Sequence, residues 1–142
     1  MTMTELIRRL EAAGVPVDDL VKIAMEDVDP AEFTDFDLDP FWNDRPVPFL
    51  FTSFGATRTI SAPHMIATLL HHLEILEGQD IMLIGSKGGY LAAIIDRMVG
   101  KDGTVTIIES HEEVREHTEG RLSMHRSSGI IRVLRPQDME SS

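Results

Sequence analysis

The chain of 142 residues contains no cysteine. This absence excludes disulfide bonds, thiolate metal ligands and a cysteine nucleophile, and it is typical of a cytoplasmic protein. Aromatic residues are scarce, at 6%, and no apolar run approaches the roughly 20 residues that a membrane-spanning helix needs. The N-terminal residues lack the basic and apolar regions of a signal peptide. We therefore expect a cytoplasmic protein with no membrane partner.

Basic residues are few: 13 lysines and arginines stand against 24 acidic residues, which gives a formal net charge of -11. Such a chain repels a phosphate backbone, so we expect no nucleic-acid partner. Histidines show no metal-ligand spacing either. His111 and His117 are six positions apart, which does not bring two side chains to one helical face. We expect no metal site.

The remaining composition, 42% hydrophobic and 26% charged, suits one folded unit. We expect a helical and irregular N-terminal arm over residues 1–50 that packs on a cofactor-binding core over residues 51–142. In the arm, Thr4 is expected to cap a first helix, and Asp18 or Asp19 to begin a second. Residues 29–48 are rich in proline and aspartate, so we expect neither a helix nor a central strand there.

Helical and strand patterns alternate through the core. Apolar periodicity predicts helices over residues 61–76 and 89–99, and a polar helix is expected over residues 112–124. Apolar and β-branched runs predict strands over residues 81–84, 104–108 and 130–134. The strand at 81–84 is continuously apolar, which predicts burial on both faces. The alternation predicts an α/β fold with three parallel strands joined by right-handed crossovers.

A glycine-rich turn follows the first of these strands. Gly85, Gly88 and Gly89 let the backbone approach a ligand at a helix N-terminus. Glu109 ends the next strand, 20 residues beyond Gly89, where an acidic side chain accepts hydrogen bonds from ribose hydroxyls. The pattern indicates a nucleoside site. The alternative is a strand-to-helix turn that binds nothing.

A second segment, Thr59-Ile60-Ser61-Ala62-Pro63-His64-Met65, opens the helix at 61–76. Ser61 is a good helix N-cap and Pro63 suits a first turn, so a structural role alone would explain both. A single histidine such as His64 is more often a packing or surface residue than a ligand.

Together the two segments resemble the protein-L-isoaspartate O-methyltransferase family, and Asp44–Pro48 resembles the entry to that family's active-site loop. The resemblance runs from about Leu6 to Asp138. It implies part of a Rossmann-like methyltransferase fold, with three strands in the order 3-2-1. It also implies S-adenosylmethionine as cofactor, and methyl transfer to isoaspartyl carboxylates in damaged proteins as the function.

The resemblance carries over the site as well. It implies that Ser61 is the catalytic residue, with its hydroxyl facing the substrate carboxylate. The cofactor contacts that it implies come from the loop, the glycine-rich turn and the strand ends: Thr59, Ser61, His64, Gly85, Ser86, Gly89, Glu109 and Asp138.

Two residues depart from the family pattern. Leu83 stands where the family has an acidic residue, and Lys87 replaces the middle glycine of Gly-x-Gly-x-Gly. Leu83 removes an acceptor for the methionine end of the cofactor, and Lys87 places a long side chain where bare backbone approaches it. Two hypotheses therefore stay open. One is an isoaspartyl methyltransferase; the other is an inactive relative that serves as a scaffold or as one subunit of a split or oligomeric assembly.

The fourth to seventh strands of the family fold have no counterpart in the chain. In that fold the first strand lies between the second and the fourth. Residues 81–84 would then form an exposed apolar edge. We expect this edge to pair across a twofold axis into a homodimer, or to take up a strand from a partner chain.

Overall fold

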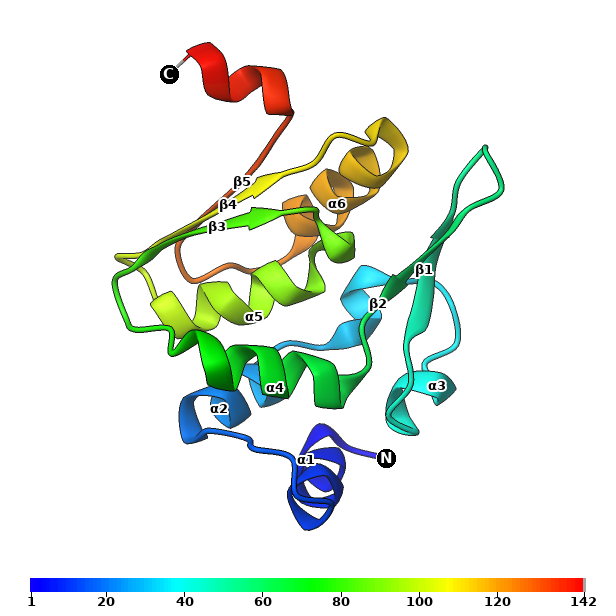
Figure 1. Cartoon of the computed structure of the whole chain (residues 1–142), viewed down its shortest axis with the longest axis vertical. Helices are drawn as coiled ribbons and strands as arrows, with labels where there is room; N and C mark the ends of the chain where they lie inside the picture. Colours follow the sequence, from blue (N-terminus) through cyan, green and yellow to red (C-terminus); the bar gives the residue numbers. More distant parts are fainter. Residues whose placement is uncertain (142) are drawn as a thin grey trace.

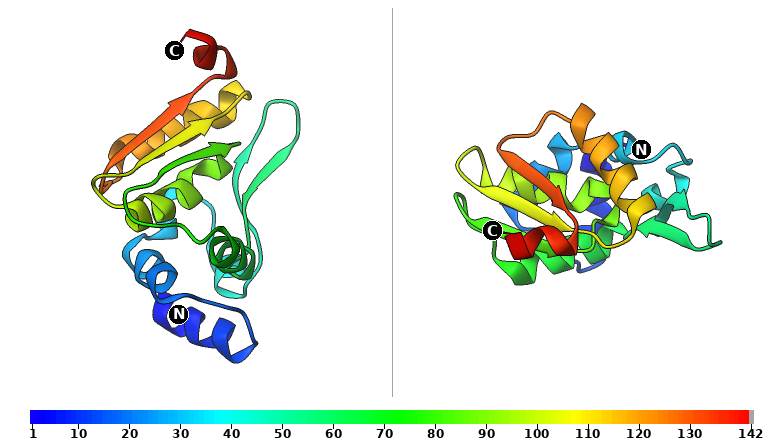
Figure 2. Two further views of the ribbon diagram at one scale, coloured as in Figure 1. Left: turned by 60° about the vertical axis from the view of Figure 1, so that its left-hand side comes forward. Right: turned by 90° about the horizontal axis from the view of Figure 1, so that it is seen from above.

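The computed structural model describes residues 1–141; Ser142, the last residue of the expected core range, lies outside the described residues. The elements, in chain order, are α1 (Met3–Ala12), α2 (Asp19–Asp27), η1 (Pro30–Phe33), α3 (Asp39–Trp42), β1 (Val47–Phe51), β2 (Thr57–Ile60), α4 (Pro63–Leu73), β3 (Asp80–Ile84), η2 (Lys87–Gly89), α5 (Tyr90–Val99), β4 (Thr104–Ile108), α6 (Glu112–Met124), β5 (Ile130–Leu134) and η3 (Pro136–Ser141). Figures 1 and 2 show α1 and η3 at opposite ends of the molecule.

The three strands β3, β4 and β5 form one parallel sheet in that order. The register is regular, so that Ile84 pairs with Ile108 and Ile108 with Leu134 at the carboxyl ends. α5 connects β3 to β4 and α6 connects β4 to β5, which gives two consecutive β-α-β units. The α/β class with three parallel strands is confirmed, as are the bounds of β4, α6 and β5.

The prediction that β3 is buried on both faces is wrong. Ile81 and Leu83 pack against the core, whereas Met82 and Ile84 are 52% and 78% exposed. In β5, likewise, every second residue contacts the core. The core lies against one face of the sheet, and β3 is at its edge, so a continuous apolar run leaves apolar side chains on the other face.

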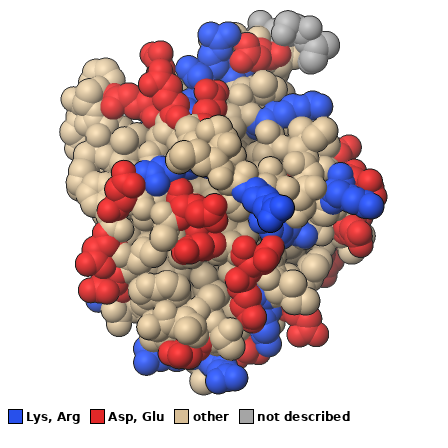
Figure 3. Space-filling model, turned by 180° about the vertical axis from the view of Figure 1, so that it is seen from behind, with Lys and Arg blue, Asp and Glu red and all other residues tan. Residues whose placement is uncertain are grey.

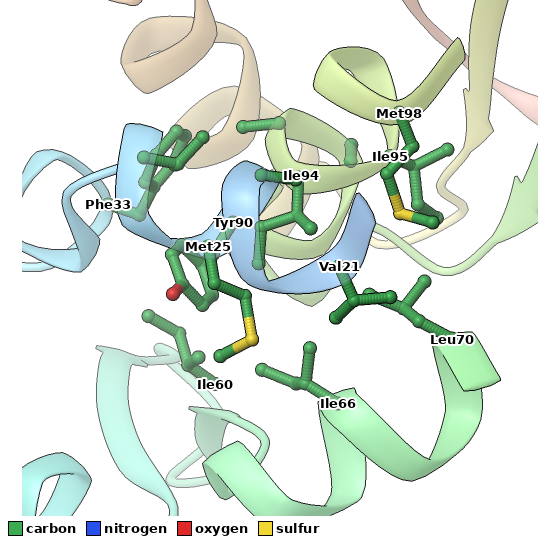
Figure 4. Close-up of a cluster of buried hydrophobic side chains, with 14 of the residues drawn as sticks. Val21, Met25, Phe33, Ile60, Ile66, Leu70, Tyr90, Ile94, Ile95 and Met98 are labelled. Atoms are coloured by element: carbon green, nitrogen blue, oxygen red, sulfur yellow. The ribbon is translucent and has the colours of Figure 1, made fainter. Parts of the chain in front are cut away.

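The core lies between α5, the N-terminal helices and α4. Figure 4 shows side chains from α2, α4 and α5 converging there, among them Val21, Met25, Ile66 and Ile94. α5 is buried on almost all sides because its sequence is apolar nearly all round. Each fully buried aliphatic side chain of this size contributes about 1.5–3 kcal/mol to the free energy of unfolding.

Three local predictions for helices are wrong. Thr2, not Thr4, caps α1, and its hydroxyl accepts the Glu5 N–H at 3.2 Å. Residues 29–48 do contain the helical segments η1 and α3. Each carries a proline in its first turn, where a missing N–H costs nothing. α4 is shorter than residues 61–76: it ends at Leu73 because Glu74 adopts a left-handed backbone, with φ of +48°.

β1 and β2 form an antiparallel hairpin that the sequence did not predict. Figures 1 and 2 show it standing beside the three-stranded sheet as a separate layer. At its tip, Ser53 donates its backbone N–H to both carboxylate oxygens of Glu113, at 3.0 and 3.1 Å, and its hydroxyl to the same group. The hairpin is therefore tied to the first turn of α6.

Candidate functional site

The turn between β3 and α5 holds four residues with a left-handed backbone. These are Gly85, Lys87, Gly88 and Gly89, with φ between +51° and +99°. A Cβ at Gly88 would lie 3.1 Å from the ring of Phe49, so packing also requires glycine there. A Cβ at Gly85 would meet no atom within 4 Å. The backbone at Gly85 thus faces open space.

Glu109 closes the same corner from the end of β4. One carboxylate oxygen accepts the Ser86 N–H at 2.9 Å and the Ser86 hydroxyl at 3.0 Å; the other accepts the His111 N–H at 2.9 Å. Burial alone would raise the pKa of Glu109, but these hydrogen bonds and the nearby Arg58 guanidinium together hold it below its ordinary value. Glu109 is therefore an anion near neutral pH, held in one orientation.

A polar cavity of about 410 Å³ opens over this corner. Its walls come from the hairpin, the glycine-rich turn and the end of β4: Phe49, Thr57, Arg58, Thr59, Ile84, Gly85, Ser86, Lys87, Glu109, Ser110 and Val114. The volume is typical of a small-molecule site. A carboxylate, hydroxyls and two cationic side chains line it, which suits a polar ligand such as a nucleoside.

An apolar cavity of about 120 Å³ lies beside it, between the start of α4 and the start of α5. It is lined by Ile60, Ser61, Met65, Ile66, Leu69, Lys87, Tyr90 and Leu91. Lys87 lines both cavities. The lining of the two adjoining cavities thus changes from polar to apolar at Lys87.

The structure gathers four of the expected site residues around the polar cavity: Thr59, Gly85, Ser86 and Glu109. Ser61 lines the apolar cavity instead. The alternative role of Ser61 as a helix cap is wrong, because Ala62 occupies the N-cap of α4 and no side chain caps that end. Gly89 lies outside both cavities, packed against Phe33.

His64 and Asp138 also lie outside these two cavities. The backbone N–H of His64 donates to Asp44 at 2.8 Å, and its Nδ1 lies 3.0 Å from the same carboxylate. Asp138 lies in η3, where its carboxylate accepts hydrogen bonds from the backbone and guanidinium of Arg135. These bonds hold the pKa of Asp138 below its ordinary value.

Sequence reasoning did not place Phe49, Arg58 or Tyr90 in the site. Phe49 and Arg58 lie on the hairpin, which the sequence did not predict. Tyr90 is fully buried, which raises its pKa well above the ordinary value. Its hydroxyl has no hydrogen-bond partner among residues 1–141.

No group of three potential metal ligands occurs in the described part of the chain. Over the same residues, no helix is long and apolar enough to cross a membrane. Figure 3 shows acidic and basic side chains intermixed on one face, without a continuous basic area among the described residues there.

A solved structure titled protein-L-isoaspartate O-methyltransferase matches this fold with a TM-score of 0.77 and 22% sequence identity. The match covers 94% of this chain and 42% of that one. The fold is therefore that of the α/β methyltransferases, here with a three-stranded parallel sheet.

The sequence defines the family more narrowly. A profile of the protein-L-isoaspartate(D-aspartate) O-methyltransferase family matches residues 1–135. The chain is 38% identical over 129 residues to the protein-L-isoaspartate O-methyltransferase of Methanococcoides burtonii, with 90% of this chain and 60% of the relative covered. It is 36% identical over 119 residues to that of Ignicoccus hospitalis, with 83% and 54% covered. The chain belongs to this family and spans just over half the length of these relatives.

Proposed function

We propose that this chain provides the cofactor half of a protein-L-isoaspartate O-methyltransferase and takes part in methyl transfer from S-adenosylmethionine to isoaspartyl carboxylates. One observation carries the proposal: Glu109, Ser86 and the open backbone at Gly85 meet in the same polar cavity. S-Adenosylmethionine supplies an already activated methyl group.

The residues present fit this cofactor at its ribose end. Glu109 is anionic and oriented, and it would accept hydrogen bonds from the ribose hydroxyls. Gly85 would allow the cofactor close to the backbone. At the amino-acid end, Leu83 offers no acceptor and packs against the core, which leaves Ser86 as the polar side chain there. In this proposal three further residues act indirectly, by fixing segments around the site. His64 fixes the loop through its bond to Asp44, and Gly89 allows the turn to pack on Phe33. Asp138 fixes the segment after β5 through Arg135.

Ser61 is proposed as the residue that orients the substrate carboxylate. Its hydroxyl makes no hydrogen bond among the described residues and lies at the apolar cavity beside Lys87. Methyl transfer needs no proton relay of its own, so orientation of the acceptor oxygen is the main contribution open to the protein.

We further infer that β5, β4 and β3 are the 3-2-1 half of the methyltransferase sheet. In this proposal residues 1–50 are an arm on a core that starts at residue 51, and the two make one compact unit. The shared cluster of Val21, Met25 and Phe33 with Tyr90 and Ile94 supports the single compact unit (Figure 4).

Calorimetric titration with S-adenosylhomocysteine, the product form of the cofactor, tests the proposal. We expect one site per chain and at least tenfold weaker binding in Glu109→Gln, since a charge-assisted hydrogen bond contributes about 1.5–3 kcal/mol. Glu119→Gln, on the exposed side of α6, is the matched control. Equal affinities in the two variants would refute the ribose role, and no binding by the unmodified chain would refute the cofactor site.

A second candidate is a scaffold or one subunit of a larger assembly, and the free edge of β3 favours it. Over residues 1–141, β3 pairs with β4 alone, and Met82 and Ile84 are exposed beside its other edge. We propose that this edge pairs with the same edge of a second copy across a twofold axis, or with a strand of a partner chain. Sedimentation velocity at micromolar concentration would refute the homodimer if the chain is monomeric and Ile84→Lys sediments identically.

A further inference from the structure

Lys87 lies where the polar and apolar cavities meet, and its backbone holds it there. Its φ of +51° is in the left-handed region, and its side chain lines both cavities. Neighbouring Gly88 packs against Phe49, and Gly89 against Phe33. The backbone of the turn is therefore held by packing, and the Lys87 side chain reaches both cavities from it.

The junction is cationic and unengaged. The Lys87 side chain makes no hydrogen bond or ion pair among residues 1–141. Arg58, in the polar cavity, lies near the Glu109 carboxylate instead and lowers its pKa. In a chain with a net charge of -11, an unpaired cation at this junction attracts a carboxylate.

The apolar cavity beside this junction has the size of a single side chain. Its volume of about 120 Å³ is close to the roughly 150 Å³ of an apolar cavity that admits benzene. Met65 and Leu69, on α4, form part of its lining and remain 55% and 43% exposed. A bulky apolar group entering here would cover both residues.

We propose that the site selects peptide segments in which the acidic residue adjoins a bulky aliphatic or aromatic residue. The carboxylate binds at Lys87 beside Ser61, and the neighbouring side chain fills the cavity between α4 and α5. One of the two adjoining cavities is polar and the other is apolar, and a peptide with an acidic residue next to an apolar one matches both. The inference rests on the proposed function, since it takes the substrate to be a peptide, and it adds the sequence preference.

Fluorescence anisotropy with labelled isoaspartyl peptides tests the preference, with S-adenosylhomocysteine present. The peptides differ in one residue after the isoaspartate: leucine, phenylalanine or glycine. We expect the leucine and phenylalanine peptides to bind at least tenfold more tightly than the glycine peptide. Leu69→Glu should remove this difference, whereas the control Ile23→Glu, at a 65% exposed site on α2, should keep it.

A second pair of variants separates charge from shape. Lys87→Met should weaken all isoaspartyl peptides by a similar factor and reduce the salt dependence of binding, while the leucine preference remains. Met65→Glu repeats the test of the cavity should Leu69→Glu lose its folded circular dichroism spectrum.

The outcomes distinguish this inference from the proposed function. Equal binding of the leucine and glycine peptides, with normal binding of S-adenosylhomocysteine, overturns the preference and leaves the function standing. Loss of self-association in Leu69→Glu without any peptide preference also overturns it, because a second copy would then cover the cavity. Failure to bind S-adenosylhomocysteine, or to distinguish isoaspartyl from aspartyl peptides, overturns the proposed function itself.

Discussion

The carboxylate of Glu109 accepts both the backbone N–H and the hydroxyl of Ser86. The bonds join the end of β4 to the turn after β3, so two neighbouring strands present their polar ends as one surface. Because the His111 N–H binds the second carboxylate oxygen, the side chain cannot rotate away without breaking several hydrogen bonds. The candidate ribose acceptor is thus also a structural connection.

That connection predicts a pH dependence of stability. The pKa of Glu109 lies below its ordinary 4.5 in the folded protein, so its carboxylate stabilises the fold above that pH. The contribution is lost as the pH falls through the folded-state value. Glu109→Gln should therefore unfold at lower urea concentration near neutral pH, and the gap to the unmodified chain should shrink below pH 4.5. A gap that widens in acid would contradict the assignment.

The left-handed backbone at Lys87 is disfavoured for a residue that carries a side chain. A non-glycine residue in the left-handed region costs about 1–2 kcal/mol, and glycine avoids this cost. Part of the gain is offset because glycine has more freedom to lose from the unfolded chain. Lys87→Gly should raise the free energy of unfolding by about 0.5–1 kcal/mol. Lys101→Gly, in a turn without positive φ, should lower it. Chemical denaturation of the two variants checks the sign.

The glycines at 88 and 120 form a matched pair. A Cβ at Gly88 would lie 3.1 Å from the Phe49 ring at a φ of +76°, so Gly88→Ala should cost about 1–3 kcal/mol. A Cβ at Gly120, inside α6, would meet nothing within 4 Å. Gly120→Ala should therefore stabilise the protein by about 0.5–1 kcal/mol through helix propensity. Thermal unfolding of both should give shifts of opposite sign.

Removal of the Tyr90 hydroxyl should raise the stability of the protein. The buried group has no partner in the described residues, and an unsatisfied polar atom costs about 1–3 kcal/mol. Tyr90→Phe keeps the ring contacts with Phe33 and Phe41 and should raise the melting temperature. A lower melting temperature would show that the hydroxyl does have a partner in solution.

Much of the sheet could be read from the sequence. β4, α6 and β5 follow strong local signals: β-branched runs, a glycine turn and a charged helix. The polar cavity was predictable in part for the same reason, since Gly85 and Glu109 lie at the ends of those strands. Periodicity could not reveal how many layers cover a strand, and the burial of β3 was therefore mispredicted.

The hairpin was missed for a different reason. β2 exposes three of its four residues, and β1 contains a proline and an irregular register near Leu50. Neither strand alternates apolar with polar residues in its sequence, which is the signal of a half-buried pair. Arg58 became a site residue only through long-range packing of this hairpin beside the glycine-rich turn.

The two ends of that hairpin are held unequally. At its base, Val47 and Ile60 are buried in the core; at its tip, Ser53 and Glu113 form an exposed contact that water can replace at little cost. The hairpin, which forms one wall of the polar cavity, is therefore anchored in the core at its base. Its tip is joined to α6 by this exposed contact. If this contact opens, the hairpin tip can move on the nanosecond-to-microsecond timescale of loop motion while the sheet behind it stays intact.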